Sequence, residues 1–320
     1  MARYIARRVL WGVALLVIVS AVVFVLFYVF PSADPAKLRA GRTANPQLIE
    51  QIREQLHLDD PIYVQFWDYM KGVFLHFDFG RSFTSQADVR TIILDRLPAT
   101  ALLVAGSVVI WLMIGLPVGI ISAVMRRSLL DRSTMIITLA FISAPVFWLG
   151  LVALYLFAQD VGLIHIFPGI GSYLSADTFL AKCESMLLPW MVLAAATAAI
   201  YARYLRSSMI DTMSEDYIRT ARAKGLPERD VVLRHGVRSA ITPIVTLLGL
   251  DVGLLLAGNA ILTETVFNIP GVGQQIVLSI RRSDLPMIQG IVLFGAFFII
   301  IFNLIVDILY AYLDPRVRYQ

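Results

Sequence analysis

Six long apolar segments set the strongest limit on what this 320-residue chain can fold into. They cover roughly residues 9–30, 99–125, 134–158, 187–202, 241–262 and 289–311, and the fourth, with Pro189 near its start, is the shortest. Each is near the ~20 residues that an α-helix needs to cross a bilayer. The sequence therefore predicts an all-α membrane protein with six transmembrane helices.

The composition agrees with this fold class. Hydrophobic residues make up 58% of the chain, charged residues only 16%, and the mean hydropathy is +0.75, which is typical of a polytopic membrane protein. Segment 9–30 is too long for the apolar region of a signal peptide and lacks a small-residue cleavage site, so we expect a retained helix. A signature of nucleic-acid binding is missing from the sequence.

Arginine and lysine in the short connections predict the orientation. One side of the membrane would carry Arg3, Arg7, Arg8, Arg126, Arg127, Arg132, the basic residues of 203–238, Arg316 and Arg318. The short loops of the other side carry only Lys182, Arg281 and Arg282. The positive-inside rule then places both termini in the cytoplasm, and the long basic segment after the first helix weighs little in that rule.

The segment from 31 to 97, expected outside, has the pattern of a folded unit. Asn45-Pro46 starts one helical repeat, with Leu48, Ile49, Ile52 and Leu56. A second follows Asp60-Pro61, with Ile62, Phe66, Tyr69, Met70, Val73 and Phe77. Two amphipathic helices would lie at the outer membrane surface or cover the mouth of a pathway. Packing on the external helix ends is the favoured role, and docking of an external partner is the alternative.

Catalytic and metal chemistry lack the residues they need. The four histidines, His57, His76, His165 and His235, fall outside the apolar spans, and Cys183 is the single cysteine, so the sequence predicts no metal site and no catalytic site. A phosphate-binding P-loop needs glycine before its lysine, but Lys37, Lys71, Lys182 and Lys224 follow Ala36, Met70, Ala181 and Ala223. We therefore expect no cofactor on this chain; if ATP drives the protein, a separate subunit hydrolyses it.

Two acids fall within the predicted spans. Asp307 is near the end of the last span, where pairing with Arg316 or Arg318 is expected. Asp251 lies deeper, and a buried acid in a membrane is a functional candidate by default, so it is a candidate for the substrate pathway. A hydrogen bond that fixes helix packing is an equally good interpretation. Asp251 is also the only feature of the sequence that supports a secondary carrier, which is the least favoured of the functions considered.

The stretch from 215 to 226 predicts a short polar helix between two apolar segments. Ser214 is the expected N-cap, Glu215 and Asp216 suit the positive end of the helix dipole, and Gly225 suits the C-terminal turn before Pro227. A second helix is expected from Glu228 to Ser239. Such a capped helix fits a groove on a partner. The candidate docking residues are Glu215, Asp216, Tyr217, Arg219, Thr220, Ala221, Arg222, Ala223, Lys224, Gly225 and Leu226, the small ones among them permitting close approach.

At these residues the chain resembles the permease subunits of bacterial ABC importers of the dipeptide/oligopeptide and nickel type. Residues 216–226 are similar to that family's version of the EAA loop, although Arg219-Thr220-Ala221 stands where the general motif has Glu-Ala-Ala. Further matches are Tyr4 to Arg8, Leu58 to Pro61 with Gln65 and Gly80, His235, Arg238, Ala240, Pro243, Leu256 to Gly258, Leu262 to Phe267, Pro270 to Gly273 and Asp314 to Arg316. Phe77 to Gly80 and Asp251 depart from the family pattern, which leaves the pathway lining and the cargo open.

The resemblance implies a type I ABC importer permease fold, with a long external segment as in the B-type subunit. The chain would then have three parts: the cytoplasmic N-terminus with the first transmembrane helix (1–30), an external segment with amphipathic helices (31–97) and a core permease domain with five transmembrane helices (98–320). Within the core domain the resemblance implies a cytoplasmic coupling loop at about 203–240 that enters a cleft of an ATPase subunit. The implied partners are a homologous second permease, two ATPase subunits that carry ATP and Mg, an external binding protein and the lipid of the bacterial inner membrane.

The resemblance implies that the cargo is a short peptide. Other members of the branch import glutathione, nickel chelates, antimicrobial peptides or oligosaccharides, which are the alternative cargoes. The rival of another class is a channel or passive pore, which would not need the 215–226 helix. Glu264, just beyond the fifth span and before Pro270-Gly271-Val272-Gly273, is a candidate for an external gate. A local cap, or a salt bridge with Arg281 or Arg282, is the alternative role of Glu264.

Overall fold

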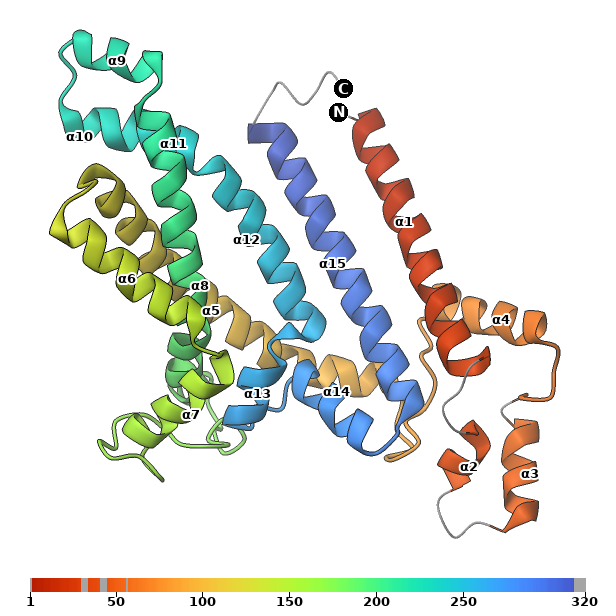
Figure 1. Cartoon of the computed structure of the whole chain (residues 1–320). Helices are drawn as coiled ribbons and strands as arrows, with labels where there is room; N and C mark the ends of the chain where they lie inside the picture. Colours follow the sequence, from red (N-terminus) through yellow and green to blue (C-terminus); the bar gives the residue numbers. More distant parts are fainter. Residues whose placement is uncertain (1, 30–33, 41–44, 56, 314–320) are drawn as a thin grey trace. The chain divides into compact units, whose positions relative to one another are not determined.

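The computed structural model describes residues 2–29, 34–40, 45–55 and 57–313, and nearly all of its regular structure is helical (Figure 1). Its elements are α1 (Ala2–Phe24), η1 (Val25–Val29), α2 (Pro35–Ala40), α3 (Pro46–Gln55), α4 (Ile62–Lys71), η2 (Gly72–His76), α5 (Val89–Val124), α6 (Leu129–Ser143), α7 (Val146–Phe157), α8 (Phe179–Met213), α9 (Asp216–Ala223), α10 (Glu228–Asp230), η3 (Val231–Gly236), α11 (Val237–Ala240), α12 (Thr242–Leu254), η4 (Leu255–Asn259), α13 (Ile261–Phe267), α14 (Val272–Arg281) and α15 (Leu285–Leu313), where η marks π-helical turns.

Among the described residues, four helices are long and apolar enough to cross a bilayer alone. They are Ile5–Val29, Val89–Val124, Phe179–Met213 and Leu285–Ile308. Two further candidates are bent pairs of helices, Leu129–Ser143 with Val146–Phe157 and Glu228–Ala240 with Thr242–Gly258. Counting each pair as one span gives the six that the sequence predicts.

The third predicted span is not a single helix. α6 and α7 meet at an angle of 101°. Pro145 carries no N–H with which to continue the helix, and it disfavours the helical conformation of Ala144, whose ψ is 126°. The fifth predicted span is also interrupted, because Gly258 adopts a φ of 105° that side chains rarely allow. The fourth is longer than 187–202, since α8 continues through Pro189 over 35 residues.

The chain forms two compact units that interleave along the sequence. The first comprises Met1–Thr100, Gly253–Ile261 and Pro270–Leu304, and the second comprises Ala101–Val252, Leu262–Ile269 and Ile305–Gln320. α5, α12, α13 and α15 therefore each contribute residues to both units.

The first unit contains the two helices predicted between 45 and 77. Asn45 caps α3 by accepting a 2.7 Å hydrogen bond from the Leu48 amide, as its position before Pro46 predicts. Leu56 of the same predicted repeat lies outside the described residues. α4 packs on α1, where the rings of Phe66 and Tyr69 lie within 5.2 and 5.6 Å of the Phe24 ring. These contacts match the predicted packing on helix ends.

The core of the first unit joins the start of α5 to α14 and α15. Its fully buried members are Val89, Ile93, Val272, Met287 and Ile291. Beside it, the buried carboxylate of Asp284 accepts hydrogen bonds from the Ser82 hydroxyl and, at 2.9 Å, from the Phe83 amide. One acid at the start of α15 thus fixes the loop that precedes α5.

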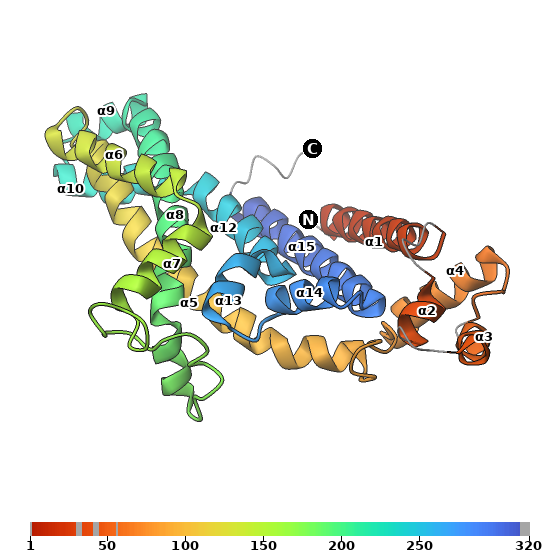
Figure 2. The ribbon, with the colours of Figure 1, turned by 60° about the horizontal axis from the view of Figure 1, so that its bottom comes forward.

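In the second unit α5 and α8 approach to backbone contact. A Cβ atom on Gly115 would lie 2.8 Å from the carbonyl oxygen of Ala198, and one on Gly119 would lie 2.7 Å from that of Ala202. Figure 2 shows the bend between α6 and α7 beside α8, against which both helices pack. The second unit is therefore built around α8.

Candidate functional site

The predicted polar helix is present as α9, at the end of α8 (Figure 1). Ser214 is not its N-cap. α8 runs on to Met213, so Ser214 caps that helix, and its hydroxyl donates to the carbonyl of Asp211. Glu215 has the extended conformation of an N-cap, with φ of −69° and ψ of 152°. Asp216 stands in the first turn, where a negative charge suits the helix dipole.

The C-terminus of α9 ends in a complete Schellman motif. The amide of Gly225 donates to the Arg222 carbonyl at 2.9 Å, and the amide of Leu226 donates to the Ala221 carbonyl at 3.4 Å. Gly225 has a φ of +77°, the left-handed value that this motif requires and glycine provides most easily. The predicted stop at Gly225 is confirmed.

One face of α9 is buried against its own chain. Ile218 and Ala221 are 0% and 6% exposed and pack with Val231 of η3, while Met213 covers the cluster. The side chain of Ala221, a candidate docking residue, therefore holds the helix in place instead of facing outward. The second predicted helix is confirmed as the continuous run α10, η3 and α11, from Glu228 to Ala240.

Two polar contacts tie α9 to the helical run that follows it. The Tyr217 hydroxyl lies 2.9 Å from that of Ser239. The Arg222 guanidinium donates to both carboxylate oxygens of Glu228, at 3.1 and 2.7 Å, and this contact lowers the pKa of Glu228. Tyr217 and Arg222 thus act as braces, although both remain partly open to solvent.

The opposite face of α9 is exposed to solvent, and it carries both charged and short side chains. Asp216, Arg219, Thr220 and Ala223 share it, following the spacing of three and four residues that one helix face requires. The Arg219 guanidinium lies 3.3 Å from Asp216, and the Thr220 hydroxyl donates to the Asp216 carbonyl. Exposed candidate docking residues beyond this face are Glu215, Lys224, Gly225 and Leu226. A braced helix with one short, open face can enter a groove on a partner without reorganising.

The other candidate site lies within the second unit, at Asp251 of α12. Its carboxylate accepts a 2.7 Å hydrogen bond from the hydroxyl of Tyr201 on α8, and the residue is half-buried. The ring of Tyr201 lies 5.8 Å from that of Trp111, whose Nε1 is buried without a hydrogen-bond partner in the described part of the chain. Asp251 therefore has both a packing contact and a side that is not fully covered.

The gate candidate Glu264 sits in α13 and is 0% exposed. Its backbone carbonyl accepts a 2.8 Å hydrogen bond from the Ile269 amide, which closes the turn after α13. Arg281 and Arg282, considered as salt-bridge partners, are exposed. Arg316 and Arg318, expected partners of Asp307, lie outside the described residues, as does the predicted motif of Asp314 to Arg316.

An ion pair that the sequence did not reveal holds the stem of α9. Asp131, at the start of α6, accepts from the Arg206 guanidinium on α8 at 2.7 and 2.8 Å, and also from the Ser122 hydroxyl and the Arg127 amide. Asp131 is 4% exposed. Asp131 falls just outside the predicted third span, so it was not among the acids considered within the membrane. The sequence feature that pointed to this position was the helix cap Ser128, three residues earlier. The contact fixes α8 a short distance before α9 begins.

Groups of histidine, cysteine and acidic side chains that could hold a metal ion do not occur among the described residues. Two of the candidate sites have polar groups that are open on one side, the exposed face of α9 and the half-buried carboxylate of Asp251. The face of α9 can make contacts with another molecule, and the carboxylate can accept a further hydrogen bond or pair with a cation.

Comparison with known proteins identifies the family. Residues 115–319 match the model of the binding-protein-dependent transport system inner membrane component, and residues 1–104 match the model of the N-terminal part of such components. The glutathione transport system permease protein GsiC of Escherichia coli (strain K12) is 42% identical over all 320 residues of both chains. GsiC of Shigella dysenteriae is likewise 42% identical, and that of Salmonella typhi 41%, each over the full length of both chains.

The helical fold with its candidate spans agrees with these matches, which cover almost the whole chain. An ABC permease subunit is a multi-pass component of the inner membrane that works with ATPase and substrate-binding subunits. The chain therefore belongs to the binding-protein-dependent ABC transporter permeases, in their peptide and nickel branch, and has their type I fold.

Proposed function

We propose that this chain forms half of the translocation pathway of an ATP-driven importer of short peptides, and that glutathione, itself a tripeptide, is the first cargo to test. The observation that carries the proposal is the end-to-end identity of 41–42% with permeases named for glutathione transport. The other half of the pathway would come from a homologous second permease. Two ATPase subunits and an external binding protein would complete the assembly, with ATP and Mg held by the ATPases.

The geometry of α9 supports its role as the coupling helix of this assembly. The buried pair Ile218 and Ala221 and the Arg222–Glu228 contact make α9 a firm body, and its open face offers Arg219, Thr220 and Ala223. A force applied by an ATPase to this face would pass into α8 directly, because only Ser214 and Glu215 separate the two helices. This end of the protein and both termini would then lie in the cytoplasm.

Asp251 supports a pathway that accepts a positively charged amino group. Its carboxylate keeps one hydrogen bond, from Tyr201, and is only half-buried. An uncompensated acid facing lipid is costly, so a hydrated pathway or a subunit interface is its favourable surrounding. The terminal ammonium of a peptide cargo would meet this carboxylate on its way through.

Uptake by the reconstituted transporter tests the function and the cargo separately. The chain is co-expressed with its neighbouring transporter subunits, placed in vesicles with ATP inside, and supplied with its binding protein and labelled glutathione, dipeptides or longer peptides outside. We expect ATP-dependent uptake in which glutathione competes best. Faster uptake of dipeptides or longer peptides would refute glutathione as cargo while keeping the peptide importer. Uptake driven by an ion gradient without ATP would refute the importer itself.

A further inference from the structure

A long apolar slot runs through the second unit between α5, α6, α7 and α8. Its volume is about 750 Å³. It is lined by both arms of the 101° bend at Pro145, α6 and α7, which pack against α8. The lining from α8 includes Leu188, Met191 and Val192 and four small side chains that leave space in the slot: Ala195, Ala198, Ala199 and Ala202.

The lining of the slot is chemically uniform. Of its lining side chains only Thr134 and Thr138 are polar, and the Thr138 hydroxyl already donates to the Thr134 carbonyl at 2.7 Å. A peptide, an ion or a sugar would have to lose its hydration here without gaining hydrogen bonds. The occupant that this lining favours is a hydrocarbon.

The slot is long enough for a hydrocarbon chain. The lining of α8 extends from Leu188 to Ala202, which corresponds to a length of about 21 Å at ~1.5 Å per residue. One bilayer leaflet is about 15 Å thick, so an acyl chain that spans its leaflet fits within the length of the slot.

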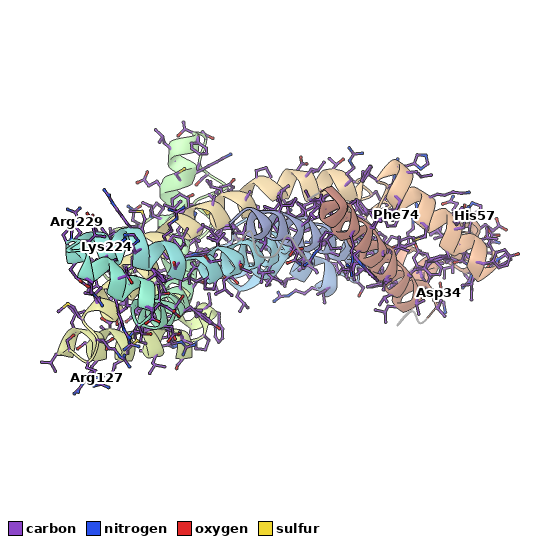
Figure 3. All side chains as sticks on the ribbon, turned by 90° about the horizontal axis from the view of Figure 1, so that it is seen from above. Asp34, His57, Phe74, Arg127, Lys224 and Arg229 are labelled. Atoms are coloured by element: carbon purple, nitrogen blue, oxygen red, sulfur yellow. The ribbon has the colours of Figure 1, made fainter. Side chains whose placement is uncertain are left out.

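Positive charge marks one end of the slot. Thr134 and Val118 line that end, where Arg126 and Arg127 lie on the turn that joins α5 to α6 and Arg132 lies in the first turn of α6. All three arginines are exposed, and Figure 3 shows Arg127 at the same end of this unit as Lys224 and Arg229. The neighbouring carboxylate of Asp131 is paired with Arg206, so it does not compete with an outside anion for the guanidinium groups of these arginines. Basic groups at the end of an apolar site between transmembrane helices attract the headgroups of anionic lipids.

We propose that this slot binds one acyl chain of an anionic phospholipid from the surrounding bilayer, with the lipid phosphate held at Arg126, Arg127 and Arg132. Leu129, 80% exposed at the start of α6, would enter the membrane interface beside the headgroup. The bound lipid fills the space between the bent pair and α8, and so supports the helix that leads to α9.

Lipid retention tests the apolar part of the site. The transporter that contains this chain is incorporated into nanodiscs of phosphatidylcholine and phosphatidylglycerol in equal parts, extracted in detergent, and its bound lipids are counted by native mass spectrometry. Ala195→Phe places a ring in the slot, and we expect the loss of one retained lipid per copy of this chain. Ala196→Phe, one position along the same helix and outside the slot lining, is the matched control and should retain the lipid.

The charged part of the site is tested by lipid selectivity. Arg132→Gln leaves the slot intact and should lower the preference for phosphatidylglycerol over phosphatidylcholine about fivefold, the ratio expected for one arginine near a lipid headgroup. Arg90→Gln, an exposed arginine outside the turn, should not change it. Unchanged lipid retention in Ala195→Phe, or equal losses in Ala195→Phe and Ala196→Phe, would overturn the proposal. Loss of the second permease from Ala195→Phe with the lipid still bound would also overturn it, and would make the slot a subunit interface.

Discussion

Replacing Gly225 isolates the contribution of a single backbone turn to ATPase docking. A Cβ atom at this position meets nothing within 4 Å, so a side chain creates no clash. The cost comes from the φ of +77° alone, which is strongly disfavoured for a β-branched residue. Gly225→Val therefore changes the direction of the chain after α9 and leaves the packing beneath the helix in place.

The magnitude follows from that conformation. A left-handed residue with a side chain costs about 1–2 kcal/mol relative to glycine, so either the Schellman motif opens or the helix stays strained by that amount. An energy of this size weakens the docked state about 5- to 30-fold. Asparagine tolerates the left-handed region better than other side chains, so Gly225→Asn should lose much less.

Two measurements check the prediction, with membrane insertion of the variants as the common control. ATPase subunits are titrated onto the purified permease, and ATP hydrolysis is measured with and without the binding protein. We expect weaker binding and reduced stimulation in Gly225→Val, with Gly225→Asn close to the wild type. The reasoning is refuted if the valine protein retains its ATPase and couples hydrolysis to uptake as the wild type does.

Three other side chains give predictions of their own. Asp251→Asn keeps the shape of the carboxylate and should slow the uptake of basic peptides more than that of neutral ones; equal wild-type rates for both would leave Asp251 as a packing partner of Tyr201. Glu264→Gln, at a fully buried position, should reduce the ATP hydrolysis that the binding protein stimulates without changing basal hydrolysis. If stimulation and uptake are both unchanged, Glu264 is not part of the gate. Asp131→Ala should destabilise the protein by about 3 kcal/mol in thermal or denaturant unfolding, the lower end for a buried pair because Arg206 is partly exposed. A double-mutant cycle with Arg206→Ala that shows no coupling would contradict this last prediction.

The membrane class of the protein followed from the sequence because long apolar segments have few alternatives. Their lengths predicted the spans, and α1, α5, α8 and α15 are each long enough to cross a bilayer alone. The breaks were missed because a hydropathy pattern averages over one proline. Pro145 bends its span by removing one amide hydrogen and restricting Ala144, neither of which changes the apolar count.

Local signals also predicted α9 well, since caps and stops act within a few residues. Gly225 and Pro227 correctly predicted its C-terminal end. The N-cap is Glu215 and not Ser214, because α8 continues to Met213 and Ser214 is the C-cap of α8. How far a neighbouring helix extends depends on what packs against it, and that information does not lie in the capping residues themselves.

The sequence by itself determined the helical class, the approximate spans, the coupling-helix motif and, through its resemblance, the family. Tertiary structure decided which face of α9 is open, since the burial of Ile218 and Ala221 depends on Val231 in the next helical run. It also paired Asp131 with Arg206 and Asp251 with Tyr201, contacts that join residues 75 and 50 positions apart. Periodicity and capping report only on neighbours along the chain, whereas ion pairs and slots between helices arise from which helices meet and at what angle.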